Sequence, residues 1–336
     1  GVESGGTYRN AEFIRNSDLE LDKTTRNTSR YGANLSAKID VRTTKTTNLS
    51  FGGQYIYNYG NNFSYANSMY NYDKNTITTN YTWRVFGRFT QRFPAGQDSR
   101  SFIKNVYYTI QADYSRNHSK FMDPDHEDDI FKYGYLGKYT TYKEQTYEQG
   151  DETVNGVEYN NVSLLNSWDN DTLYSFEPGI YNPIVSKYTS QIYSLFPGSD
   201  IRNEDDLQLK GGLLNGQGPP SVYGLWASPG AIQSGFGESD NTQIGLNASA
   251  AADVGNHELR FGFQYEQRIS RGYGYAARPL WTLMRGLTNF HILELDIDNP
   301  YIVEEDGVFQ GIIKYPRKYD PNTQYTFDKK LKKKLG

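Results

Sequence analysis

The chain has 336 residues, a formal net charge of −4, no cysteine and 30 Tyr. This charge provides no positive field to attract nucleic acid, so we expect no nucleic-acid partner, and the lack of cysteine excludes disulfides, cysteine-ligated zinc and thiol catalysis. No apolar run approaches the ~18 residues of a transmembrane helix. Tyrosine combines an apolar ring with a polar hydroxyl, so its abundance suits a membrane–water interface or a surface that binds sugars or peptides.

The first predicted hairpin has strands at 30–42 and 49–59, joined by a turn at 43–47. Hydrophobicity alternates with a period of two, the signature of a strand with one apolar face. In the first strand the even positions are polar or glycine, and the odd positions are Tyr31, Ala33, Leu35, Ala37, Ile39 and Val41. In the second strand the apolar set includes Leu49, Phe51, Tyr55, Tyr57 and Tyr59.

Two more hairpins follow the same pattern. One has strands at 77–93 and 102–116 joined by residues 94–100, and the other has strands at 241–254 and 257–270 joined by residues 255–256. All these runs are longer than the ~5–6 residues of an ordinary strand, and they exceed the ~9–11 residues that cross a bilayer. We therefore predict an all-β fold, an antiparallel transmembrane β-barrel segment of about six long strands.

The connections alternate in length, as in bacterial barrels, where short turns are periplasmic and long loops extracellular. The prediction assigns residues 1–28 to an extracellular connection, 29–116 to two hairpins, 117–240 to a long extracellular loop region, 241–271 to the third hairpin and 272–336 to an extracellular loop. Six strands cannot close around a charged lumen, whereas transporters with a plugged lumen have about 22 strands. Gly1 is not a start methionine and no signal peptide is visible, so we expect an internal piece of a larger protein.

Three groups of side chains are candidate sites. Aromatic residues in the long loop could bind cargo, and their simpler role is to pack the loop: Trp168, Tyr174, Tyr181, Tyr188, Tyr193, Tyr223 and Trp226. Charged residues on the polar strand faces are predicted to face the lumen, where they pair with each other or with a plug: Arg84, Arg88, Arg92, Asp113, Arg260, Glu266 and Arg268. An acidic stretch could hold a structural Ca²⁺ or simply be solvated: Asp123, Asp125, Glu127 and Asp129.

Several stretches resemble the barrel region of TonB-dependent receptors of Bacteroidetes, in the Oar-like branch related to the SusC-like transporters. They are NLSAKID at 34–40, IKNVYYTIQADY at 103–114, FKYGYLGK at 131–138, HELRFGFQYEQ at 257–267, LWTLMRGLTN at 280–289 and LDIDNP at 295–300. The resemblance covers most of residues 28–145 and 238–330 and is weaker over 146–237. It implies a Gram-negative outer-membrane protein that imports a nutrient with energy from the TonB complex, in SusC-like relatives under a surface lipoprotein lid.

The chain shows no plug, TonB box or closing strand, so contact with TonB would come from parts of the protein outside this chain. The cargo stays open among oligosaccharides, peptides and metal chelates. No catalytic motif is present, since the four histidines form no HExxH and no Gly-x-Ser-x-Gly elbow occurs, and we expect no enzyme. The alternatives are an adhesin or secretion-associated scaffold barrel, and a soluble glycan-binding β-sandwich, whose apolar faces would be buried between two sheets.

Overall fold

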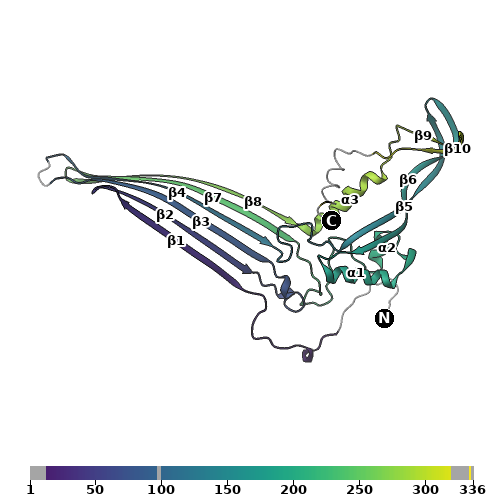
Figure 1. The fold of residues 1–336 in the computed structure, drawn as a ribbon, viewed down its shortest axis with the longest axis horizontal. Helices are drawn as coiled ribbons and strands as arrows, with labels where there is room; N and C mark the ends of the chain where they lie inside the picture. The colour runs from purple at the N-terminus through teal and green to yellow at the C-terminus, as the bar shows by residue number, and fades with distance from the viewer. Residues whose placement is uncertain (1–12, 97–99, 319–332, 334–336) are drawn as a thin grey trace.

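The computed structural model describes residues 13–96, 100–318 and 333, and its main feature is a six-stranded antiparallel sheet in the order β1-β2-β3-β4-β7-β8. The strands are β1 (Arg30–Arg42), β2 (Thr47–Asn61), β3 (Ile77–Phe93), β4 (Ile103–Met122), β7 (Gly235–Val254) and β8 (His257–Ala276). Figure 1 shows the short turns together at one end of this sheet, and the helices and a second sheet at the other. The prediction of six long antiparallel strands is confirmed.

In the middle of the ladder, the register aligns side chains of one kind in one row. The row through Ile39 continues across the sheet as Phe51, Gly87, Ala112, Leu246 and Tyr265. The adjacent row, through Asp40, continues as Ser50, Arg88, Gln111, Asn247 and Gln264. Because successive side chains of a strand point to opposite faces, the sheet has one apolar and one polar face.

No second layer covers the apolar face among the described residues. Leu35 is 66% exposed, Ile39 64%, Phe261 70% and Phe263 60%. Every residue of β1 and of β8, the two edge strands, is exposed. A contiguous apolar surface of this extent is unfavourable in water, so the sheet requires an apolar environment or a partner on this face.

β2 extends two residues beyond its predicted limits at each end, and three other strands extend further. β4 continues to Met122 instead of ending at 116, β7 begins at Gly235 instead of 241, and β8 continues to Ala276 instead of 270. In these extensions, polar side chains of β4 and β7 take the place of apolar ones on the same face and contact each other across the strands. His118 lies 3.6 Å from Glu238 and 3.4 Å from Asp240. The apolar alternation that marks a strand is lost in this stretch, although the backbone pairing is not.

A second, four-stranded sheet lies at the loop end of the molecule, in the order β5-β6-β10-β9 (Figure 1). It consists of β5 (Gly137–Val154), β6 (Val157–Pro178), β9 (Tyr301–Glu305) and β10 (Val308–Lys314). β5 and β6 form an antiparallel hairpin, and β10 pairs parallel to β6. The regions 117–240 and 272–336, predicted as loops, thus contain strands and helices. The prediction missed β5 and β6 because these strands lack the strict apolar alternation of the main sheet.

The helices of the loop end pack around the base of the β5–β6 hairpin. They are α1 (Pro183–Leu195), α2 (Glu204–Leu209) and α3 (Ala277–Leu293), with the 3-10 turn η4 (Gly198–Asp200) between α1 and α2. The other 3-10 turns lie in the connections before β1 and before β3: η1 (Asn16–Asp18), η2 (Tyr65–Asn67) and η3 (Tyr72–Lys74). β6, α1 and α2 share a core of Tyr174, Ile192, Ile201, Leu207 and Leu214. Within the described part of the chain, no helix combines the length and apolar character needed to cross a bilayer. We call the second sheet with these helices and their connections the lobe.

Two glycines allow the segment after β4 to approach the segment before β7. The Gly216 amide donates to the Gly134 carbonyl at 2.8 Å. Both residues have positive φ, +77° at Gly134 and +88° at Gly216, and a Cβ on Gly216 would lie 2.5 Å from the Arg278 carbonyl oxygen. Glycine is required here by both backbone conformation and space.

We expect Gly216→Ala to destabilise the lobe by more than the ~1–2 kcal/mol that left-handed backbone alone costs an alanine. Gly156→Ala is the matched control, because Gly156 has φ +83° but a Cβ added there would have no atom within 4 Å. The urea midpoint of lobe unfolding measures both. Equal shifts for the two variants would contradict the role of close packing at Gly216.

Candidate functional site

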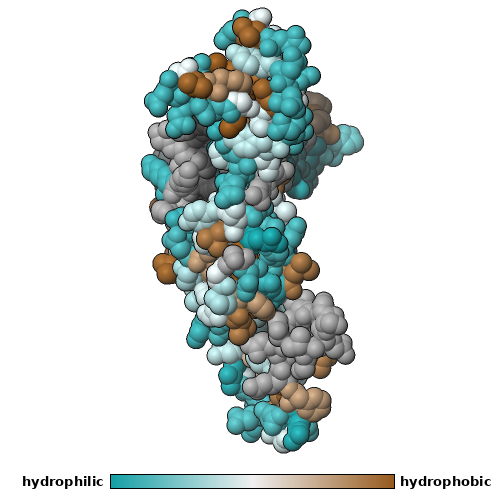
Figure 2. Space-filling view, turned by 90° about the vertical axis from the view of Figure 1, so that its right-hand side faces the viewer, coloured by the Kyte–Doolittle hydropathy of each residue, from teal (hydrophilic) through white to brown (hydrophobic). Residues whose placement is uncertain are grey.

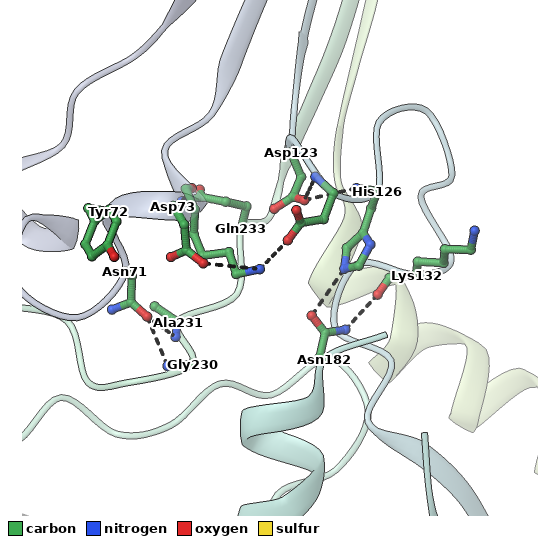
Figure 3. A network of polar contacts seen from close by, with 12 residues as sticks. Asn71, Tyr72, Asp73, Asp123, His126, Lys132, Asn182, Gly230, Ala231 and Gln233 are labelled. Atoms are coloured by element: carbon green, nitrogen blue, oxygen red, sulfur yellow. Dashed lines mark hydrogen bonds and ion pairs between the residues drawn. The ribbon is translucent and has the colours of Figure 1, made fainter. Parts of the chain in front are cut away.

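The long connections of the main sheet are joined to each other by buried asparagine side chains. Asn71 is 1% exposed, and its Oδ1 accepts from the amides of Gly230 and Ala231, each at 3.0 Å. Its Nδ2 donates to the carbonyl oxygens of Ala227 at 3.2 Å and Ser228 at 3.0 Å. Figure 3 shows Asn71 facing Gly230 and Ala231. One amide thus fixes the segment before β3 to the segment before β7.

A second asparagine joins the start of α1 to the segment after β4. Asn182 donates to the carbonyl oxygens of Lys132 and Tyr135, each at 2.9 Å, and its Oδ1 lies 3.2 Å from His126 Nε2 (Figure 3). Trp281 of α3 donates its indole N–H to the Tyr133 carbonyl at 2.8 Å. These contacts hold the lobe against the end of the main sheet.

The predicted Ca²⁺ ligands make protein contacts instead of facing a common point. Among the residues that the structure describes, no group of three or more His, Cys, Asp or Glu side chains could hold a metal ion. Asp123 is buried and accepts from the amides of Asp125 at 2.9 Å and His126 at 3.1 Å. Asp125 forms an ion pair with Lys74, and Asp129 lies 3.2 Å from Lys132.

Most of the predicted cargo-binding aromatic residues pack the lobe. Tyr174 is buried with its ring 5.4 Å from that of Tyr139, and Tyr193 stacks on Phe176 at 5.8 Å. Burial raises the pKa of the Tyr174 and Tyr193 hydroxyls, so both stay protonated at neutral pH. The remaining contacts are a hydrogen bond of Tyr188 to the Gly211 carbonyl and ring contacts of Tyr181 with Tyr135 and of Tyr223 with Tyr70, while Trp226 is half-buried.

Two of these aromatic residues, Trp168 and Tyr174, line a cavity of about 820 Å³ at the base of the β5–β6 hairpin. The cavity lies among β5, β6, α2, α3 and the segment after β10. Its charged lining residues are Lys143, Asp171, Glu204, Asp205, Arg285 and Arg317. Arg317 lies over the Trp168 ring, with its guanidinium carbon 4.4 Å from the ring centre. We call this space the hairpin cavity.

A smaller cavity of about 310 Å³ lies between α1 and the segment before β7, and Tyr188 lines it. Its walls are more apolar, with Ile184, Val185, Pro220 and Val222 among them. Of the two cavities, the hairpin cavity has the combination of flat aromatic surface and charged groups that recognises a polar ligand.

The seven charged residues predicted to face the lumen all lie on the polar face of the main sheet. The register places Arg84 in one row with Arg268, Asp113 with Glu266, and Arg92 with Arg260. Arg88 donates to Gln111 Oε1 at 2.8 Å. Arg260 lies 2.6 Å from Glu258, and Arg268 forms an ion pair with Glu266. Arg88, Arg260, Glu266 and Arg268 therefore pair with neighbours on the same face.

Sequence reasoning did not identify Arg285, Arg317 or Lys143 as residues of a site. They come together only because α3 and the segment after β10 fold back onto the β5–β6 hairpin. The chain matches no protein-family model, no curated protein and no solved structure in the comparisons.

Replacing Asn71 by Ala removes one acceptor and one donor that serve four backbone groups. We expect the opening free energy of the Gly230 and Ala231 amides to fall by about 2–4 kcal/mol, because buried donors are left without acceptors. Hydrogen exchange of these two amides measures it. Asn166→Ala, at an exposed position of β6, is the control, and unchanged protection at Gly230 in Asn71→Ala would contradict the expectation.

The stability of the segment after β4 is expected to depend on pH because of Asp123. Burial raises the pKa of this carboxyl above its ordinary value of 3.8, so the folded state favours the protonated form. Its stabilising contribution is complete below pH 3.8 and is lost as the pH rises through the raised pKa.

We therefore expect Asp123→Asn, which retains an acceptor for the amides of Asp125 and His126, to remove this pH dependence and to be at least as stable as the wild type at pH 7. Hydrogen exchange of these amides, corrected for intrinsic rates, tests it across the acidic range. The same pH dependence in the variant and the wild type would assign the effect to a group other than Asp123.

Proposed function

We propose that this chain is a segment of an outer-membrane β-barrel that works as part of a TonB-dependent transporter and imports a nutrient. The observation that carries the proposal is the uncovered apolar face of a sheet with long strands. In a soluble sandwich these rows would be buried against a second sheet. In a barrel they face acyl chains, while the charged rows line the lumen.

The position of the apolar band supports strands that are tilted in a membrane. Toward the loop end, the apolar residues of β1 extend as far as Tyr31. In the row of Tyr31, β4 and β7 already have the charged residues Lys120 and Glu238. At the turn end, Phe261 and Leu259 of β8 lie beyond the row of Val41, the last apolar residue of β1. The band thus crosses the strands obliquely, as expected for barrel strands tilted by about 35–45°.

The loop-end border of the band has the composition of a membrane–water interface. Tyr31 stacks on Tyr59 with ring centres 4.7 Å apart, and Tyr57 contacts Tyr81 at 5.1 Å. Beside these tyrosines lie the charged and polar side chains that β4 and β7 pair across the strands, among them Lys120 and Glu238. Tyrosine is enriched at such interfaces because its ring is apolar and its hydroxyl prefers water.

The unequal ends of the sheet support an orientation. The connections at 43–46 and 255–256 are short, which is typical of the periplasmic side, and the lobe lies at the opposite end. The surface in Figure 2, viewed from the lobe side, is largely hydrophilic with separate hydrophobic patches, which suits exposure to water outside the cell. TonB coupling and a surface lipoprotein lid rest on the family resemblance alone.

A pair of adjacent substitutions on β8 tests the membrane face. We expect Phe263→Arg to reduce the amount of folded protein in the outer-membrane fraction, because arginine near the bilayer midplane costs about 2–4 kcal/mol. Gln264→Arg, on the opposite face, should have little effect. Heat-modifiable gel migration reports folding. Equal effects of the two substitutions, or extraction of the wild type without detergent, would exclude the membrane barrel.

Deleting TonB separates an importer from a barrel that is only an adhesin or scaffold. We expect uptake of the cargo to be lost in the deletion strain, because the proton-motive force drives import through TonB. Unchanged uptake, with the protein still folded in the outer membrane, would favour the scaffold.

A further inference from the structure

The hairpin cavity has the size of a ligand site. Its volume of about 820 Å³ lies within the ~300–1,000 Å³ of small-molecule pockets. The Trp168 ring supplies flat apolar surface, and the charged residues around it come from five separate segments of the chain: β5, β6, α2, α3 and the segment after β10. What the cavity binds depends on which of its charges are already neutralised.

Four of the six charged lining residues pair with each other. Lys143 forms an ion pair with Asp171, and both side chains are largely buried. Arg285 lies 3.5 Å from Glu204 and also donates to the Asn215 carbonyl oxygen. These pairs leave no net charge, so they shape the cavity without selecting a charged ligand.

The other two charges, Arg317 and Asp205, have no ion pair among the described residues. The guanidinium of Arg317 is held against the Trp168 ring, which leaves its N–H edges available for a bidentate contact with a carboxylate. Asp205 is exposed in the first turn of α2 and offers a carboxylate that can accept from an ammonium group. The cavity therefore presents one unpaired cation and one unpaired anion.

We propose that the hairpin cavity binds short peptides with free termini, with Arg317 contacting the carboxylate and Asp205 the ammonium group. The Trp168 ring would pack against the peptide between its ends. An acidic oligosaccharide would satisfy Arg317 but would place its negative charge near Asp205, and a neutral one would use neither charge. As a statement about imported cargo, this inference rests on the proposed transport function, but binding itself does not require transport.

Calorimetry on the full chain purified in detergent tests the inference with three probes: tetraalanine with free ends, its N-acetyl derivative and its C-terminal amide. We expect the free peptide to bind. The affinity of either blocked peptide should be lower by a factor of about ten or more, because each block removes a charge-assisted hydrogen bond. An oligogalacturonate serves as the anionic glycan. Binding of the glycan in preference to the free peptide would overturn the proposal.

Substitutions assign each terminus to one residue. Asp205→Asn should abolish discrimination against the N-acetyl peptide and retain discrimination against the amide, whereas Arg317→Gln should do the reverse. Asp200→Asn and Lys318→Gln, at positions that do not line the cavity, are the controls of matching chemistry and should leave binding unchanged. Equal binding of all three peptides to the wild type, or no peptide binding, would overturn the proposal.

Failure of the transport proposal gives a different result. The chain would then be absent from the outer membrane or take up cargo without TonB, while peptide binding in detergent and its loss in the variants would persist. Conversely, a folded outer-membrane protein that does not bind the free peptide would overturn the cavity inference alone.

Discussion

The antiparallel ladder of the main sheet determines which environment each face and each edge of the sheet requires. Its register aligns side chains of like character across the middle of all six strands, so one face is mainly apolar and the other mainly polar. Within hydrocarbon, every backbone polar group must be paired inside the protein, and a ladder that closes on itself achieves this. β1 and β8 are the two edges of this sheet. In a bilayer both edges require further strands, which connects the exposed apolar face to the proposal that this sheet belongs to a larger barrel.

Asparagine solves the corresponding problem where the chain leaves the ladder. Long connections contain buried backbone groups that no strand satisfies, and a side-chain amide can both donate to and accept from them. Asn215 shows this at the base of the β5–β6 hairpin: it accepts from the Leu136 amide at 2.7 Å and donates to the Gly137 carbonyl at 2.9 Å. Asn71 and Asn182 do the same at other junctions. The lobe therefore keeps a defined shape with small apolar clusters in place of one large core.

The main sheet could be predicted from the sequence because its signal is local. The alternation at 30–42 and 77–93 places both strands at their observed bounds. The prediction ended too early at 116, since Arg116, His118 and Lys120 break the apolar pattern while pairing with acidic residues of β7, which are more than a hundred residues away in the sequence. For the same reason Tyr174 could be recognised as a candidate for a ligand contact but not as a buried core residue. Its neighbours Ile192, Ile201 and Leu214 come from separate segments of the chain.

Only part of the hairpin cavity could be predicted from local sequence patterns. Trp168 was identifiable as an aromatic loop residue, but its partner Arg317 is brought to it by the parallel pairing of β10 with β6. The same topology decides which charges are neutralised: Lys143 and Asp171 face each other across one hairpin, whereas Glu204 meets Arg285 from a different helix. The charge of the chain as a whole therefore says nothing about the cavity. In the proposed peptide site, selectivity would depend on Arg317 and Asp205, which have no ion pair among the described residues. A change in the β6–β10 pairing would then alter ligand preference without altering the apolar face of the main sheet.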